Sequence, residues 1–533
     1  MTTTLLRGGR VLTPAHPWAT ALLTDGGTVR WLGPDAGAPA ADRVVDLAGA
    51  FVAPAFVDAH VHATQTGLAL SGLDLAGARS LAQALESVEA EARRLRGRVI
   101  LGTGWDDTRW PERRPPVPAE LDRASYGGVV YLARVDHHSA VVSSALLAAA
   151  PDARGLAGWS DSGHLTLAAH HAVRRAAYGS LTAAQREAAQ REFRRHAASL
   201  GIGCVHEMSG PQITGGVVDL ESLLRLAEQE PGPEVIGYWG ELGGQPAGAA
   251  GAGLDAGAAG AGLDPGAAGA GLDTVARLGL AGAAGDLFCD GSFGSRTAAL
   301  SAPYADAPDT TGHLWHGVDA LADHIAACTR RGVQAGFHAI GDAALQAVLD
   351  GMAKAAEQVG LDAVVAARHR IEHAEMPPSV AEFARFGLVA SVQPAFDAFW
   401  GGPDGMYAER LGADRAAGLN PLAAFMANGV PLAFGSDAPV TPLDPWGGVR
   451  AAVQHRTEGS RIWPYAAFAA ATVGGWEAAR RTGEGELTPG APATYAVWDT
   501  GELGEGGLPD LTPGARLPTC MRTVVRGTTI YER

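Results

Sequence analysis

The middle of the chain alternates between short apolar runs and longer stretches in which apolar residues recur at helical spacing. After the run at 334–338, for example, Leu345, Val348 and Met352 share one helical face, and Gly360 ends the stretch. This alternation predicts a parallel α/β fold, and eight runs suit a closed (β/α)8 TIM-like barrel. The predicted strands lie at 56–62, 203–207, 235–239, 287–290, 334–338, 369–373, 389–393 and 431–435.

Both ends of the chain show a different pattern, in which short β-type runs are separated by Gly, Pro and Asp. Neither end is large enough for a core of its own. The two ends are therefore predicted to pair into one small β-sandwich, made of residues 1–52 and 486–533, with the barrel at 53–485.

Two segments are longer than a barrel crossover needs. From about residue 70 to 200, helical patterns and a strand-like run at 129–134 predict a subdomain inserted over the barrel mouth. Residues 248–273 are nearly all Ala and Gly, and Gly-Ala-Gly-Leu-Asp occurs three times from residue 251 onward. Their few large apolar groups predict a flexible surface linker, and so short a repeat argues against a solenoid.

Composition narrows the functional classes. The net charge of −16 disfavours nucleic acid as a partner, because its phosphates would be repelled. No run reaches the ~20 apolar residues of a membrane span, and the first residues show no secretion signal. The four cysteines form no CxxC pair, which indicates reduced thiols in a cytoplasmic protein. A homo-oligomer is compatible with the sequence.

Residues that commonly bind metals stand at the ends of several predicted strands. His60 and His62 are separated by one residue, so they project from the same face of the first strand. Chance would explain this pair alone, but His338, His373 and Asp437 end the fifth, sixth and eighth strands. In a barrel such strand ends meet. Imidazole with one carboxylate suits zinc or another divalent transition metal.

Longer motifs around these residues resemble the amidohydrolase superfamily over nearly the whole chain. The finer motifs are similar to the branch that contains N-substituted formamide deformylase and the YtcJ-like proteins, although Pro54-Ala55 replaces the Pro-Gly common there. They are Gly104-Trp-Asp-Asp, Arg134-Val-Asp-His-His-Ser, Asp290-Gly-Ser-Phe-Gly-Ser-Arg, His338-Ala-Ile-Gly-Asp, Arg370-Ile-Glu-His and Gly435-Ser-Asp-Ala-Pro. Members of the branch act on varied amides, so the resemblance leaves the substrate open.

The resemblance implies hydrolysis of a non-peptide C–N bond in a linear amide such as an N-substituted formamide. A metal-activated water would attack the carbonyl carbon, and Asp437 would accept its proton and pass it to the leaving nitrogen. His373 would bind metal or contact the water and the developing oxyanion.

Other polar side chains are weaker candidates. Trp105, Arg134 and His138 in the inserted region, and Arg296 after the fourth strand, are candidates for substrate binding, although packing or surface pairing would explain each. Five further histidines are expected at the surface: His164, His170, His171, His313 and His316.

The sequence predicts one metal ion rather than two. Many superfamily members bridge two ions with a carboxylated lysine, but the only lysine, Lys354, lies on the solvent face of a predicted helix. Asp286 stands at that lysine's position, but its shorter side chain is expected to bridge two ions only if the strand moves inward, which a packed barrel resists. Glu207, at the end of the second strand, is the better candidate for a bridge. We therefore expect one tightly held ion on His60, His62, His338 and Asp437, with His373 close by.

Two other interpretations are open. A deaminase or cyclic amidase of the superfamily would share the metal site, although the residues after His338 lack the Glu that deaminases carry there. A catalytically silent metal-binding protein is the third, but it would not need a proton acceptor at Asp437.

Overall fold

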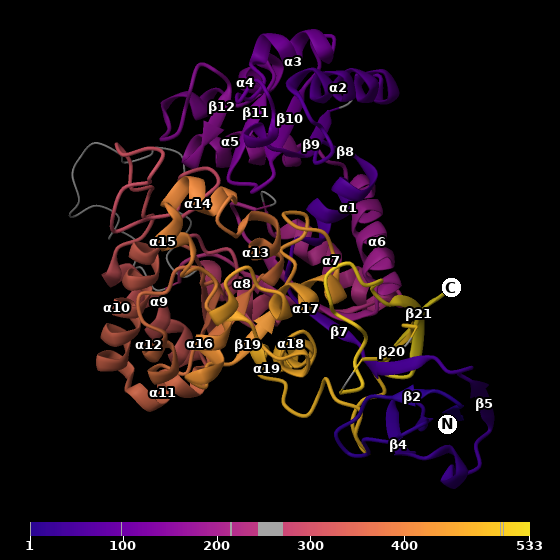
Figure 1. Ribbon diagram of the computed structural model, residues 1–533. Helices are drawn as coiled ribbons and strands as arrows, with labels where there is room; N and C mark the ends of the chain where they lie inside the picture. Colours follow the sequence, from indigo (N-terminus) through magenta and orange to yellow (C-terminus); the bar gives the residue numbers. More distant parts are fainter. Residues whose placement is uncertain (1, 98, 214–215, 244–269, 502, 505) are drawn as a thin grey trace.

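The computed structural model describes residues 2–97, 99–213, 216–243, 270–501, 503–504 and 506–533. Its centre is an eight-stranded parallel sheet curled into a nearly closed barrel (Figure 1). Hydrogen bonds from His62 N to Ala438 O (3.0 Å) and from Asp437 N to His60 O (2.8 Å) join the first strand to the last. The predicted barrel is thus confirmed. Its strands are β7 (Phe56–Val61), β13 (Ile202–Ser209), β14 (Glu234–Trp239), β15 (Gly282–Ala283), β16 (Gln334–Ala339), β17 (Arg370–His373), β18 (Val389–Val392) and β19 (Leu432–Phe434).

Helices surround the barrel. Because such a sheet has no solvent face, β7 and β13 are buried along their whole length. Lys354 is exposed on α10, as predicted, and it pairs with Asp319 (2.7 Å). The helices are α1 (Ala63–Ser71), α6 (Ala183–Ser199), α7 (Val217–Gln229), α8 (Ala270–Leu278), α9 (Val318–Arg331), α10 (Asp342–Val359), α11 (Leu361–Ala367), α12 (Val380–Arg385), α13 (Pro394–Trp400), α14 (Met406–Leu411), α15 (Ala413–Ala416), α16 (Leu422–Ala427), α17 (Pro445–Val453), α18 (Pro464–Ala470) and α19 (Val473–Ala478).

The fourth barrel strand lies elsewhere than predicted. β15 is only Gly282–Ala283, and the predicted run at 287–290 follows it as a separate extended segment. Gly285 separates the two with a φ of +93°, and a Cβ there would approach Met208 Sδ to 2.8 Å, so this turn requires glycine. The turn moves Asp286 out of the strand and into the barrel mouth.

The two chain ends form the predicted sandwich, at the lower right of Figure 1. One sheet has the order β4-β3-β1-β5 and the other β2-β6-β20-β21-β22, so β6 and β20 join the two ends directly. Leu6 and Leu22 of one sheet share a core with Val52 and Val497 of the other. The strands are β1 (Thr3–Arg7), β2 (Arg10–Val11), β3 (Ala21–Asp25), β4 (Thr28–Gly33), β5 (Arg43–Asp46), β6 (Phe51–Pro54), β20 (Tyr495–Asp499), β21 (Thr519–Val525) and β22 (Thr528–Glu532).

The segment after α1 forms an additional sheet with the order β12-β11-β10-β9-β8, at the top of Figure 1. Alternate residues of β10 face opposite sides: Leu132 packs in the cluster with α2 and α3, and Tyr131 in the cluster with α4 and α5. The inserted subdomain is therefore a layered α/β unit. Its elements are β8 (Leu73–Asp74), α2 (Leu81–Leu95), β9 (Ile100–Trp105), α3 (Pro118–Ala124), β10 (Val130–Arg134), β11 (Ser139–Val142), α4 (Ser144–Ala149), β12 (His164–Thr166) and α5 (Leu167–Gly179).

The predicted linker at 248–273 falls mostly outside the described residues. Its last four residues are an exception, because they begin α8, where Leu272 is only 3% exposed. The repeat therefore ends in packed helix rather than in linker. Among the described residues, no helix combines the length and apolarity needed to cross a membrane.

Candidate metal centre

His60 and His62 point into the barrel mouth from the end of β7. His60 Nδ1 donates to Glu372 Oε2 (3.0 Å), and His62 Nδ1 donates to the carbonyl of Met208 (3.0 Å). These acceptors require the proton on Nδ1, so Nε2 of each ring carries a free lone pair directed at the site.

His338 and His373 approach from the ends of β16 and β17, which are neighbours in the sheet. Each of these rings also donates through one nitrogen and leaves the other free. His338 Nε2 donates to Gly291 O (3.1 Å), and His373 Nδ1 donates to Gln393 Oε1 (2.8 Å). In β17 alternation directs Glu372 inward, and His373 reaches the same space because its backbone adopts a left-handed φ of +70°. Each of the four rings thus keeps its other nitrogen as a lone pair directed into the barrel mouth, within 3.8 Å of Asp286.

Asp437 lies beyond β19 and also has a positive φ, of +54°. Its Oδ1 is 3.1 Å from His62 Nε2 and 3.5 Å from His60 Nε2. Asp58 fixes the backbone of this turn, since its Oδ1 accepts from Ser436 N (2.9 Å). The five metal-binding candidates predicted from the sequence therefore converge.

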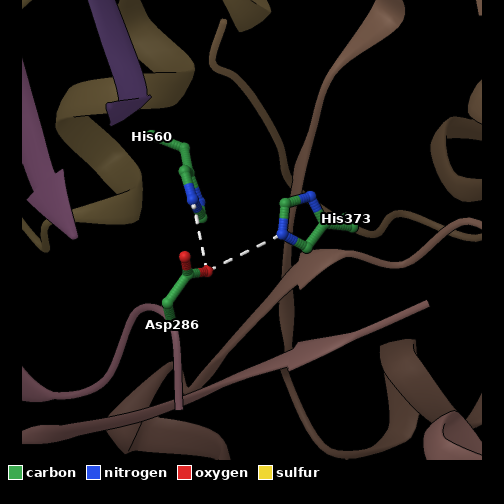
Figure 2. A group of neighbouring side chains, drawn as sticks. All are labelled: His60, Asp286 and His373. Atoms are coloured by element: carbon green, nitrogen blue, oxygen red, sulfur yellow. Dashed lines mark ion pairs between the residues drawn. The ribbon is translucent and has the colours of Figure 1, made fainter. Parts of the chain in front are cut away.

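Asp286 occupies the middle of the site, although its short side chain was expected to need an inward movement of the strand to bridge two ions there. Its Oδ1 lies 3.5 Å from His60 Nε2, 3.4 Å from His338 Nδ1 and 3.8 Å from His373 Nε2, and Figure 2 shows it between His60 and His373. Its Oδ2 lies 3.2 Å from His62 Nε2. The turn at Gly285 brings Asp286 into the site. A local pattern of apolar residues does not predict this turn.

The donor set fits a divalent transition metal. Five buried atoms at this point have no hydrogen-bond partner in the described part of the chain: His60 Nε2, His338 Nδ1, His373 Nε2, Asp286 Oδ1 and Asp437 Oδ1. Orphaned buried polar atoms are costly and need a partner. Ligand bonds of about 2.1 Å at tetrahedral angles separate donors by roughly 3.4 Å, close to the distances above. Two overlapping groups suit an ion: His60, His62 and Asp437, and His60, Asp286 and His373.

Glu207, the bridge candidate preferred from the sequence, lies outside this donor set. Its carboxylate accepts from Ala63 N (2.8 Å) and from Ser209 Oγ (3.0 Å). Burial raises its pKa to about 7. These contacts hold it at the start of α1, whereas Asp286 lies among the metal-binding candidates.

A buried network beneath the site was not anticipated. Arg370 donates from Nε to Glu372 Oε1 (2.8 Å) and from Nη2 to Ser391 Oγ (3.0 Å). Burial alone would raise the pKa of Glu372, but the Arg370 charge lowers it to about 2. The ionised carboxylate orients His60. Alternation along Arg370-Ile-Glu-His predicts that Arg370 and Glu372 share a face, which was the available signal.

Of the four residues predicted to bind substrate, two line a cavity at the site and two lie elsewhere. Arg134 and His138 line a cavity of about 30 Å³ beside His338, His373 and Asp437. Trp105 instead packs inside the inserted subdomain, where its Nε1 donates to Leu132 O (2.9 Å). Arg296 pairs with Asp306 (2.6 Å) and is not among the residues that line the cavity.

Arg134 has no free hydrogen-bonding nitrogen. Its Nη2 donates to Asp106 (2.9 Å), Nη1 to Asp136 (3.0 Å) and Nε to Asp107 (3.3 Å). These bonds use three of the five N–H donors of the guanidinium and hold its loop together. Two of the five histidines that were predicted to lie at the surface do not lie there. His170 and His171 are buried in α5.

The barrel and its buried His/Asp cluster define a metal-dependent hydrolase of the barrel type. The profile of the amidohydrolase family matches residues 43–531, so the chain belongs to this family. The family recognised from the motifs is thereby confirmed.

Three similar proteins are consistent with this family assignment. The YtcJ protein of Bacillus subtilis (strain 168) is 26% identical over 522 residues, covering 93% of this chain and 92% of that protein. N-substituted formamide deformylase of Arthrobacter pascens is 28% identical over 145 residues, 26% of this chain and 27% of the enzyme. The crystal structure of an uncharacterized metal-dependent hydrolase from Pyrococcus furiosus has a TM-score of 0.68 and 27% identity, covering 93% of this chain and 98% of that one.

Proposed function

We propose that this protein hydrolyses the C–N bond of a linear, non-peptide amide, such as an N-substituted formamide, with a divalent metal ion, zinc first among them. The observation that carries the proposal is the convergence of five orphaned ligand atoms at the mouth of the barrel. The similarity to N-substituted formamide deformylase supports the amide class. The buried, unpaired state of all four cysteines supports a reducing compartment, the cytoplasm.

Each residue has a role in this reaction. The bound ion would supply a water with a pKa near ~7 and polarise the carbonyl group. Asp437 is placed to accept the proton of the attacking water and to return it to the leaving nitrogen. His60 and His62 hold the ion, and Glu372 keeps His60 oriented. His338 and His373 supply the remaining imidazole nitrogens of the site. Arg134 fixes the loop that carries His138.

We keep the expectation of one tightly held ion on His60, His62, His338 and Asp437, with His373 close by, and add Asp286 as a further ligand. The reason for the addition is distance, since Asp286 Oδ2 lies 3.2 Å from His62 Nε2. His338 and His373 meet the other oxygen, Oδ1.

Two measurements test the proposal. Metal analysis should find the ion in protein purified without chelator and should find it lost from the His60→Ala/His62→Ala double variant; full retention would refute the site. Metal-loaded protein should then release the amine from a panel of N-substituted formamides and acetamides. Ammonia as the product would indicate a deaminase, and no turnover over the whole panel would favour a silent metal-binding protein.

A further inference from the structure

His138 reaches the metal centre from the inserted subdomain rather than from the barrel. Its ring centroid lies 4.9 Å from that of His338 and 5.5 Å from that of Phe288. The residue lines two small cavities, both of which are also lined by His338, His373 and Asp437. Within the described residues its hydrogen bond is made by the backbone, from His138 N to Asp136 Oδ1 (3.2 Å), so the ring nitrogens are free to contact a bound molecule.

The loop that carries His138 is fixed to the barrel. Asp136 Oδ2 accepts from Ser292 Oγ (2.9 Å) and Ser295 Oγ (2.7 Å), both on the loop after the fourth strand, and from Arg134 Nη1 (3.0 Å). The neighbouring His137 ring is occupied by Thr103 Oγ1 (2.6 Å). A donor held in this way needs little reorganisation when charge develops beside it.

The metal-binding candidates themselves offer acceptors rather than donors to the site. The four histidines direct their N–H groups away from the site, to Glu372, Met208, Gly291 and Gln393. Asp286 and Asp437 carry only acceptor oxygens when ionised. Three carboxylates hold the Arg134 guanidinium. An oxygen that gains negative charge during the reaction would thus obtain no hydrogen bond from the four histidines, Asp286 or Asp437.

We propose that His138 is a catalytic residue whose ring N–H donates a hydrogen bond to the oxygen of the attacked carbonyl group. The hydrogen bond strengthens as that oxygen becomes an oxyanion, so it acts on the transition state more than on the bound substrate. This inference rests on the proposed function, because it assumes attack on a carbonyl group at the metal centre.

The kinetic test compares the zinc-loaded wild-type protein with the variants His138→Ala and His138→Gln. The control variant is His164→Gln, because His164 is a histidine of β12 that lines neither cavity. With 4-nitroacetanilide as substrate, His138→Ala should lower kcat by about 100-fold, the loss typical of one oxyanion donor. KM and zinc content should stay close to wild type, because the lost contact forms in the transition state. His138→Gln should recover part of kcat through its amide N–H, and His164→Gln should retain all of it.

A binding test keeps the inference separate from the amidase proposal. Methylphosphonate carries tetrahedral oxyanion oxygens, and calorimetry should show that zinc-loaded His138→Ala binds it about tenfold more weakly than wild type, as expected for a hydrogen bond to a charged group. Wild-type binding without amide turnover would count against the amidase only. Equal methylphosphonate affinity in both proteins, no binding by wild type, or loss of zinc from His138→Ala would overturn the role given to His138.

Discussion

At the scale of single residues, the carboxyl group of Asp286 contributes a negative charge at the middle of the candidate metal centre. Burial alone would raise the pKa of its carboxyl, but the imidazoles of His338, His373, His60 and His62 lower it well below the usual range. The ionised group therefore stands among the four imidazole rings that are candidate metal ligands. Burial alone would lower the pKa values of His60 and His62, but the carboxylates of Asp286 and Asp437 leave them raised, so metal binding to these two rings competes with their protonation.

Replacing Asp286 tests its place in the site. Asp286→Ala should weaken metal binding by about tenfold or more, because one shared oxygen donor is removed from the centre. The measurement is metal content against a graded chelator. Glu207→Ala serves as the matched control and should keep the metal, since Glu207 contacts Ala63 and Ser209 instead. Two equivalents in wild type, falling to one in Asp286→Ala, would replace the single ion with a bridged pair.

Asp437→Asn separates metal binding from proton transfer. The amide can still offer an oxygen to the ion but cannot carry a proton, so kcat should fall by at least about 100-fold with metal content and melting temperature preserved. Steady-state kinetics on the best amide of the panel provide the measurement. A kcat near the wild-type value would assign the base to another residue.

At the scale of elements, local apolar patterns predict the strands that are at least three residues long. Seven barrel strands and the candidate ligands His60, His62 and His338 follow from such patterns. The fourth strand does not, because the turn at Gly285 depends on Met208 packing against it from β13. His373 and Asp437 enter the site through positive φ values that spacing alone does not reveal. Sequence analysis could therefore name most ligands but not the bend that adds Asp286.

The start of α8 offers a test of a corrected element. Leu272 belongs to the repeat but is packed in the barrel core, with 3% of its surface exposed. Leu272→Ala should therefore cost about 2–4 kcal/mol in the free energy of unfolding. Urea denaturation measures it. A change below ~0.5 kcal/mol, the size expected for an exposed position, would restore the linker interpretation.

At the scale of the whole molecule, the sandwich and the barrel share side chains. Trp498 of β20 packs edge-on against Phe56 of β7 (5.7 Å between centroids) and against Trp446 of α17 (5.7 Å). Gly201 leaves room for this indole, since a Cβ there would come within 2.2 Å of it. The strand that carries His60 and His62 is therefore anchored from below by residues of the C-terminal segment.

Trp498→Ala should weaken the barrel as well as the sandwich. The cavity left by a buried indole costs about 3–5 kcal/mol, and because the lost contacts join both cores, unfolding should stay a single transition at lower denaturant. Circular dichroism and tryptophan fluorescence should report the same midpoint. A sandwich that unfolds separately, with the barrel midpoint unchanged, would show that the two cores are energetically independent.

The pairing of β6 with β20 also has a consequence during translation. β6 leaves the ribosome early, whereas β20 and β21 follow only after the entire barrel has been made. Until then the edge of β6 that β20 will cover is open to other nascent chains, and open strand edges promote aggregation. Yield in a heterologous host should therefore respond to slower synthesis and to added chaperones, because both protect that edge until its partner arrives.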